Sequence, residues 1–372
     1  MTKPDDLLPI GLQDQLPAAS ARITHAMRAA LDVLAGQGYD RVRPPLVEFE
    51  KSLAGRMASS GAGNEARRMF RFTDPASLRT LALRSDITPQ IGRIAATSMA
   101  GAARPLRLAY CGDTAVIAAD QLDPARERLQ LGAELIGADT ARAASEIVGL
   151  AVEALQAAGL TGISVDFTLP DLVDTVSKAA MPLDAEQVDA VRRELDTKDA
   201  GGLKAAGGEA YLPLLYATGT FTDALPKLRA IDAGGALASR IAGLEEIAAT
   251  LGGDVRITLD PTERHGFEYQ SWFGFTLYAE GVLGAVGRGG TYQIAGSEEA
   301  ASGFTLYADR MARGSSDAAT RDTLYLPLSH DRALAAKLRG EGWRTIAALG
   351  EAEDPKALGA THILEVNTPK PL

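Results

Sequence analysis

The sequence predicts an α+β fold, in which helices flank an antiparallel sheet, a helical insertion interrupts the sheet, and a small α/β appendage follows. Three observations predict this architecture. Short β-type runs joined by tight turns, such as the turn at residues 280–281, favour antiparallel pairing. The stretch from about 160 to 250 is rich in alanine and helical in period. After residues 314–317, which read as a linker, strand-like and helix-like segments alternate over a short distance.

The first half of the chain mixes helix and strand. Residues 1–17 read as an extended arm, and apolar residues at three- and four-residue steps then predict a helix over 18–38. Residues 39–49 have strand character, but Pro44 and Pro45 lack the backbone donors of an internal strand, which confines this segment to an edge or an interface. Further strands are expected at 78–83 and 106–111, and a further helix at 141–158.

Strand character returns after the insertion. Phe273, Phe275 and Leu277 alternate with smaller or polar residues, as expected for a strand with one buried face. The main domain is therefore assigned to residues 1–313, with the insertion inside it, and the appendage to residues 314–372. The expected strands of this part of the main domain are 255–259, 267–278 and 286–294.

Composition excludes several classes of protein. The 372 residues, 46% of them hydrophobic and 23% charged, suffice for two domains with cores of their own. A net charge of -10 argues against a protein that follows phosphate backbones. The N-terminus lacks the apolar core of a signal peptide, and no segment is apolar for long enough to span a bilayer. A cytoplasmic protein without membrane contact is therefore expected.

Metal, redox and nucleotide chemistry are not predicted. Cys111, the single cysteine, excludes an internal disulfide and reads as a small strand residue. The chain lacks the glycine-rich loops that hold phosphates at nucleotide sites, so no cofactor is expected. The four histidines are scattered, without the spacing of metal ligands, at positions 25, 265, 330 and 362.

Several segments, in the same order along the chain, resemble histidyl-tRNA synthetases. The resemblance covers roughly residues 8–313, and it implies the antiparallel core of the class II aminoacyl-tRNA synthetases together with their dimer contact. Each motif is short, and their shared order carries the resemblance. The matching segments are Pro9–Pro17, Leu83–Gln90, Glu127–Gly137, Leu259–Tyr269, Gly289–Tyr292 and Gly303–Arg310.

The resemblance implies a pocket for histidine. In the family, the segment that matches Asp86 and Thr88 holds the α-amino group of the ligand. The arginine that holds the carboxylate aligns with His265, and the neighbouring Arg264 could replace it by a shift of one residue. The complete set of implied pocket residues is Asp86, Thr88, Gln130, Glu134, Arg264, His265, Tyr269 and Tyr292.

The residue types fit such a ligand. Asp86 and Glu134 supply carboxylates for an ammonium group or an imidazole N–H. Thr88 and Gln130 offer further hydrogen bonds, and Tyr292 adds an aromatic wall with a polar tip. The alternative is structural: Asp86 caps the helix that follows it, with Thr88 in the first turn, and Glu134 lies on a solvated face.

The chain departs from the synthetases at the residues of the chemical step. The family's Phe-Arg pair, whose arginine binds the ATP α-phosphate, is replaced by Ala115 and Val116. A valine cannot stabilise the charge of the adenylation transition state, so several kcal/mol of barrier lowering are lost. Gln270 and Thr291 replace a tyrosine and an arginine of two other motifs, and the appendage is too short for a complete anticodon-binding domain.

These losses are similar to those of the synthetase-like regulatory subunits of ATP phosphoribosyltransferase, a branch of the same family. That resemblance implies a noncatalytic subunit, required with a short-form catalytic subunit for the first step of histidine biosynthesis and for feedback inhibition by histidine. It also implies a class II-type homodimer within a hetero-octamer, without tRNA binding or aminoacylation. Histidine could bind in the ancestral pocket or at a subunit junction.

Two other functions remain open. A divergent histidyl-tRNA synthetase or tRNA-related enzyme would need a basic surface for tRNA, and Val116, Thr291 and the short appendage argue against it. A histidine-binding sensor for an unrelated partner would need only the pocket.

Overall fold

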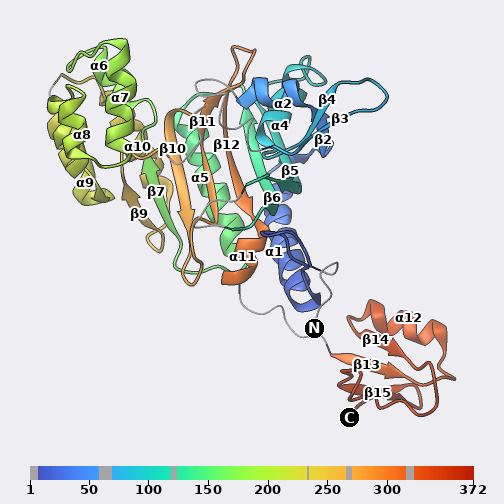
Figure 1. The fold of residues 1–372 in the computed structure, drawn as a ribbon. Coiled ribbons are helices and arrows are strands. Elements are labelled where there is room, and N and C mark those ends of the chain that lie inside the picture. Colours follow the sequence, from blue (N-terminus) through green and yellow to red (C-terminus); the bar gives the residue numbers. More distant parts are fainter. Residues whose placement is uncertain (1–6, 58–68, 119–123, 233, 265–269, 316–321) are drawn as a thin grey trace. The chain divides into compact units, whose positions relative to one another are not determined.

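The computed structural model describes residues 7–57, 69–118, 124–232, 234–264, 270–315 and 322–372. Two compact units make up the chain, Met1–Ser316 and Asp317–Leu372. Both units combine helices with a sheet, as Figure 1 shows. The predicted α+β class is confirmed.

A nine-stranded sheet forms the centre of the larger unit. Its strands are β1 (Asp40–Arg41), β5 (Leu106–Ala115), β6 (Glu127–Ile136), β7 (Ser164–Thr168), β8 (Gly219–Thr220), β9 (Arg256–Leu259), β10 (Gln270–Tyr278), β11 (Gly287–Gln293) and β12 (Ala300–Tyr307). Their order is β1-β5-β6-β12-β11-β10-β7-β9-β8. All pairs from β5 to β7 in this order are antiparallel, as the sequence predicts, and the parallel pairs are β1 with β5 and β7 with β9.

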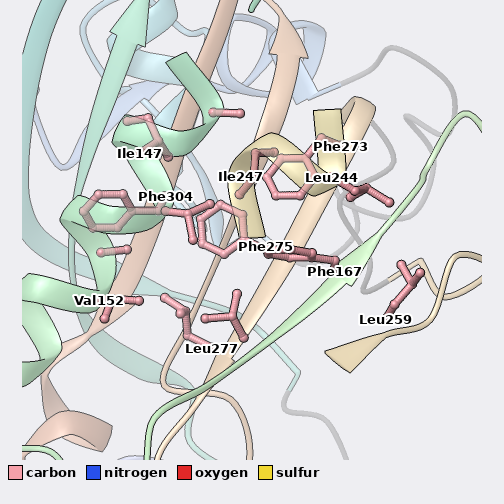
Figure 2. Packing of buried hydrophobic residues seen from close by; sticks show 14 of the residues in the cluster. Ile147, Val152, Phe167, Leu244, Ile247, Leu259, Phe273, Phe275, Leu277 and Phe304 are labelled. Carbon is pink, nitrogen blue, oxygen red and sulfur yellow. The ribbon is translucent and has the colours of Figure 1, made fainter. Parts of the chain in front are cut away.

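One face of this sheet is apolar and carries the core. The helices α1 (Pro17–Gly36), α5 (Ala141–Ala157) and α10 (Ala238–Thr250) belong to the same hydrophobic cluster as this face. Figure 2 shows Ile147 of α5 and Ile247 of α10 near the aromatic side chains of the strands. The rings of Phe167 and Phe273 meet edge to face, with centroids 5.3 Å apart. Burial of these side chains holds the helices on the sheet.

The strand predicted at residues 39–49 is divided between two sheets. Pro44 and Pro45 separate β1 from β2 (Val47–Phe49), because neither proline has an N–H to donate to a neighbouring strand. β2 belongs to a three-stranded sheet of order β2-β4-β3, with β3 (Arg71–Thr73) and β4 (Thr80–Leu83). Both β1 and β2 are edge strands, which confirms the edge position predicted from the prolines.

The helix α4 (Thr88–Ala96) covers part of the other face of the nine-stranded sheet. The short helix α2 (Glu50–Met57) contacts α4 and the strands β2 and β4. Ile87 and Ile91 pack in one cluster with Leu108 and Tyr110 of β5 and with Tyr292 of β11. α4 thereby forms a wall beside the centre of the sheet.

The helical insertion lies between β7 and β9 in the chain. The sequence predicts helix from about residue 160, and this prediction is wrong for residues 164–168, which form β7. Val165 and Phe167 alternate with polar residues there and enter the core, but five residues are too few to stand out beside long helical periods. The helices between the two strands are α6 (Leu172–Ser177), α7 (Ala185–Asp196), α8 (Ala200–Ala205), η2 (Glu209–Tyr216), α9 (Phe221–Ile231) and α10.

The larger unit ends with α11 (Ala308–Gly314), and the smaller unit has its own sheet and core. Leu324 and Leu326 pack with Leu338 of its helix. Its elements are β13 (Thr323–Leu326), α12 (Arg332–Gly340), β14 (Arg344–Ala347), β15 (His362–Glu365) and β16 (Thr368–Pro371), with strand order β14-β13-β15-β16. The predicted alternation of strand and helix in this part of the chain is confirmed.

We predict that Phe275→Ala lowers the free energy of unfolding by about 3–5 kcal/mol, because it leaves a cavity in the apolar face. Phe275 is 2% exposed and stacks on Phe273, with ring centroids 5.7 Å apart. Phe72 of β3 is 45% exposed, so Phe72→Ala is the control and should cost less than about 1 kcal/mol. Urea unfolding measures both, and equal losses would contradict this placement of the core.

Candidate functional site

A row of three glycines crosses the sheet on the face opposite the core. Gly303 of β12 lies opposite Glu134 of β6 in register. On its other side Gly303 pairs with Gly290 of β11, which in turn pairs with Gly274 of β10. Since side chains alternate along a strand, residues that pair in register share a face. The three residues, called here the glycine row, leave the floor beside Glu134 without side chains.

Sterics explain why glycine is needed in this row. A Cβ atom on Gly303 would lie 1.6 Å from Oε2 of Glu134. At Gly290, a Cβ would lie 2.5 Å from the backbone oxygen of Phe273 and 2.8 Å from Nε2 of Gln270. Side chains from neighbouring strands therefore occupy the space above these two glycines, and any larger residue would displace them.

A cavity lies over the glycine row. Polar and glycine residues dominate the lining. The residues that line it are Thr88, Glu134, Gln270, Arg288, Gly289, Gly290, Tyr292, Gly303, Phe304 and Thr305.

Glu134 is fully buried in the wall of this cavity. Its Oε1 accepts a hydrogen bond from the Thr88 hydroxyl at 3.0 Å, and its Oε2 accepts one from the Tyr292 hydroxyl at 2.8 Å. Both donors are neutral. Within the described part of the chain, no lysine or arginine forms an ion pair with Glu134. The carboxyl group thus lacks the positive charge that usually accompanies a buried acid.

A second carboxyl group, Asp86, lies behind the first. Nε2 of Gln130 donates to Oδ1 of Asp86 at 2.6 Å and to the Thr305 hydroxyl at 2.9 Å. The Tyr110 hydroxyl lies 2.7 Å from that of Thr305 and 3.1 Å from that of Thr88. A continuous set of polar contacts therefore links Asp86 to the residues that hold Glu134.

Burial controls the protonation of this network. It raises the pKa of Glu134 to about 8, although hydrogen bonds from Tyr292 and Thr88 act in the opposite direction. Burial also raises the pKa of Asp86, against the hydrogen bond from Gln130. At neutral pH Glu134 is therefore mainly protonated, and an arriving cation would favour its ionised form.

The structural alternatives for the two acids have different outcomes. α4 begins at Thr88, whose N–H donates to Oδ1 of Asp86 at 3.2 Å, so Asp86 does contact the first turn of this helix. The same oxygen also accepts from Gln130, so this contact does not exclude a role at the site. The solvated position considered for Glu134 is wrong, because no part of its surface is exposed.

The structure brings together most of the predicted pocket residues. Thr88, Glu134 and Tyr292 line the cavity, and Asp86 and Gln130 form the layer behind them. Arg264 is not among the lining residues. Its backbone N–H donates to Oδ1 of Asp196 in α7 at 2.8 Å. The remaining two, His265 and Tyr269, lie outside the described residues.

Sequence reasoning missed Arg288 as a lining residue and did not place Gln270 there. The signal for Arg288 was strand alternation: it precedes Gly290 by two residues and Tyr292 by four, which places all three on one face. Gln270, which replaces a tyrosine of the family motif, donates to the backbone oxygen of Gly289 at 2.8 Å. The other substituted position, Thr291, lies on the core side and bonds to Phe273 of β10.

The motif resemblance matches Val116 to the synthetases' catalytic arginine, and Val116 takes part in backbone pairing. Val116 follows β5, and its N–H donates to the backbone oxygen of Arg126 at 2.8 Å. The side chain of Arg126 is held by other parts of the protein. Its Nε donates to the backbone oxygen of Val116, and its guanidinium carbon lies 5.0 Å from the ring centroid of Phe70. The strand end thus holds its arginine against the protein instead of presenting it to a phosphate.

Two searches of the described residues gave negative results. No group of histidine, cysteine and acidic side chains has the arrangement of a metal site within the described ranges. Among the same residues, no helix has the length and apolar character needed to cross a membrane.

The sheet and its cavity define a class II synthetase-like core with a site for a small ligand, and comparison with solved structures supports this class. A protein described as an ATP phosphoribosyltransferase regulatory subunit/histidyl-tRNA synthetase from Bacillus halodurans superimposes with a TM-score of 0.79 and 23% identity, over 96% of this chain and 97% of that one. The histidyl-tRNA synthetase from Nostoc sp. PCC 7120 gives a TM-score of 0.78 at 14% identity, over 98% and 92%. These likenesses establish the fold.

Sequence comparisons establish the family. The family model for histidyl-tRNA synthetase matches residues 11–311. The ATP phosphoribosyltransferase regulatory subunit of Paramagnetospirillum magneticum is 39% identical over 357 residues, which cover 94% of this chain and 92% of that protein. The one from Rhodospirillum rubrum is 37% identical over 370 residues, or 96% and 95%. The chain belongs to the ATP phosphoribosyltransferase regulatory subunits, a histidyl-tRNA synthetase-like family whose name describes a regulatory chain, and aminoacylation is not expected of it.

The raised pKa of Glu134 predicts a pH-dependent stability. Between pH 4.5 and about 8 the folded state keeps a proton that the unfolded chain releases. The free energy of unfolding should therefore fall as the pH rises through this window, by at most about 1.4 kcal/mol per pH unit for this group, and level off above it. Asp86 contributes in the same direction. Glu134→Gln cannot ionise and should flatten the profile, which urea unfolding at several pH values measures.

The control for this prediction is Glu127→Gln, which changes an exposed acid at the start of the same strand and should leave the profile as in the wild type. A Glu134→Gln profile as steep as that of the wild type would show that Glu134 is not held protonated.

The glycine row makes a separate prediction. Gly303→Ala should lower the free energy of unfolding by about 1–3 kcal/mol, because the added methyl group overlaps Glu134 and forces it to move. Gly253→Ala is the matched control, since a Cβ there meets no atom within 4 Å. Thermal and urea unfolding compare the two variants, and equal stabilities would refute the close contact between Gly303 and Glu134.

Proposed function

We propose that this chain is the noncatalytic regulatory subunit of an ATP phosphoribosyltransferase. In this proposal it is required, with a short-form catalytic subunit, for the first step of histidine biosynthesis, and it mediates feedback inhibition by histidine. The observation that carries the proposal is a ligand cavity retained beside a missing catalytic cation. The cavity keeps Glu134, Thr88 and Tyr292, whereas Val116 stands where the synthetases have arginine. The names of the relatives support the same role.

Histidine is the ligand that we propose for this cavity. Its ammonium group or imidazole N–H would donate to Glu134, which has only neutral donors around it within the described chain. A cation at this point would favour the ionised carboxylate and gain a charge-assisted hydrogen bond.

The assembly is part of the proposal. We expect a class II-type homodimer within a cytoplasmic hetero-octamer that also contains the catalytic subunit, and no binding of tRNA. The unit Asp317–Leu372 would take the place of an anticodon-binding domain. Its 56 residues form only four strands and a helix in the described part, which supports a reduced role.

Reconstitution tests this function. The purified chain is mixed with the short-form catalytic subunit from the same organism, and formation of phosphoribosyl-ATP is measured with and without histidine. Activity should require both proteins and should fall when histidine is added. If the two proteins neither associate nor produce activity together, the proposed function is refuted.

Thr88→Val separates histidine sensing from activation. The substitution keeps the shape of the side chain but removes the hydroxyl that donates to Glu134. Activation of the catalytic subunit should remain, while the histidine concentration for half inhibition should rise by about tenfold, as expected for a lost hydrogen bond to a charged group. Thr222→Val, at an exposed site in the insertion, is the control. Equal inhibition of both variants would place histidine outside this cavity.

A further inference from the structure

Arg288 lies in a second polar row of the sheet, beside the glycine row. It is in register with Thr276 of β10 on one side and with Thr305 of β12 on the other. Because Arg288 precedes Gly290 by two residues on the same strand, its side chain is on the cavity face, and it lines the cavity. No family motif in the sequence contains this residue as a ligand-binding position.

Arg288 and Glu134 lie at different ends of the same cavity. They belong to β11 and β6, and β12 separates these two strands. Glu134 and Arg288 are separated by two strand spacings of about 4.8 Å across the sheet and by two residues of about 3.3 Å each along the strands. Their Cα atoms are therefore roughly 12 Å apart. The floor between them is Gly290 and Gly303, which have no side chains. The carboxyl group of Glu134 and the amide of Gln270 reach over these two glycines, and Arg288 lines the cavity beyond them.

We propose that Arg288 is the anion-binding residue of this site. The ligand is then a small zwitterion that lies in the cavity, with its cationic group toward Glu134 and its carboxylate at Arg288. A planar guanidinium suits this role, since it can donate two parallel hydrogen bonds to a carboxylate. The inference rests on the proposed function only in the choice of histidine as the probe.

The surroundings of Arg288 fit an anion. Thr276 is fully buried beside it in register, and its hydroxyl has no hydrogen-bond partner in the part of the chain that the structure describes. This hydroxyl is an unsatisfied polar group in the row of Arg288, although Thr276 itself does not line the cavity. Arg264, the arginine considered for this role from the sequence, is not among the residues that line the cavity.

Calorimetric titration of the full-length chain tests the inference with two probes, L-histidine and histamine, which lacks the carboxylate. The wild type should bind histidine at least about tenfold more tightly than histamine, because only histidine can bond to Arg288. Arg288→Gln should lose this preference through weaker histidine binding, while its affinity for histamine stays within about twofold. Arg256→Gln, a control in the exposed part of β9, should behave as the wild type.

The outcomes separate this inference from the proposed function. If Arg288→Gln still prefers histidine over histamine, the proposed role of Arg288 is overturned. The same holds if the wild type binds both probes equally well, or if it binds neither of them. Activation of the catalytic subunit is measured apart from these titrations and decides the proposed function. Should Arg288→Gln unfold, Arg288→Lys keeps the charge but loses the paired donors, and an undiminished preference in that variant would also refute bidentate binding.

Discussion

The burial of Glu134 over Gly303 is the contact on which the site depends. It requires glycine at the paired position of β12, and it removes the carboxyl group from water without supplying a cation within the described chain. Burial of an ionised carboxylate without a neighbouring cation costs free energy. The protein lowers this cost because Glu134 stays protonated and bonds to Thr88 and Tyr292. In the proposed function, a cationic group that enters the cavity favours the ionised form of Glu134 and bonds to it.

The cavity and Val116 belong to different parts of the sheet. The ligand cavity is formed by β6, β10, β11 and β12 and by the start of α4. Val116, which the motif resemblance matches to the synthetases' catalytic arginine, follows the end of β5, where its backbone pairs with Arg126. In the proposed function, this chain has lost adenylation and kept a site that responds to an amino acid.

Much of this fold could be predicted from the sequence, and the failures have physical causes. The helices at 18–38 and 141–158 were predictable because their apolar periods run for many turns. The strand β7 was missed because its alternation covers only five residues. The candidate set was found through motifs, but the burial of Glu134 depends on Thr88 and Tyr292, which are distant in sequence. Arg288 was missed because it precedes a motif, although alternation from Tyr292 reaches it.

Infrared difference spectroscopy of the ligand-free protein tests the central claim most directly, because it detects a protonated carboxyl group. The spectrum of the wild type minus that of Glu134→Gln isolates the signal of Glu134. We predict a protonated carboxyl band at neutral pH that titrates with a midpoint near the pKa of about 8 and disappears when histidine is added. A carboxylate band already present at pH 6, or a protonated band that histidine leaves unchanged, would contradict the claim that Glu134 receives the ligand's cation.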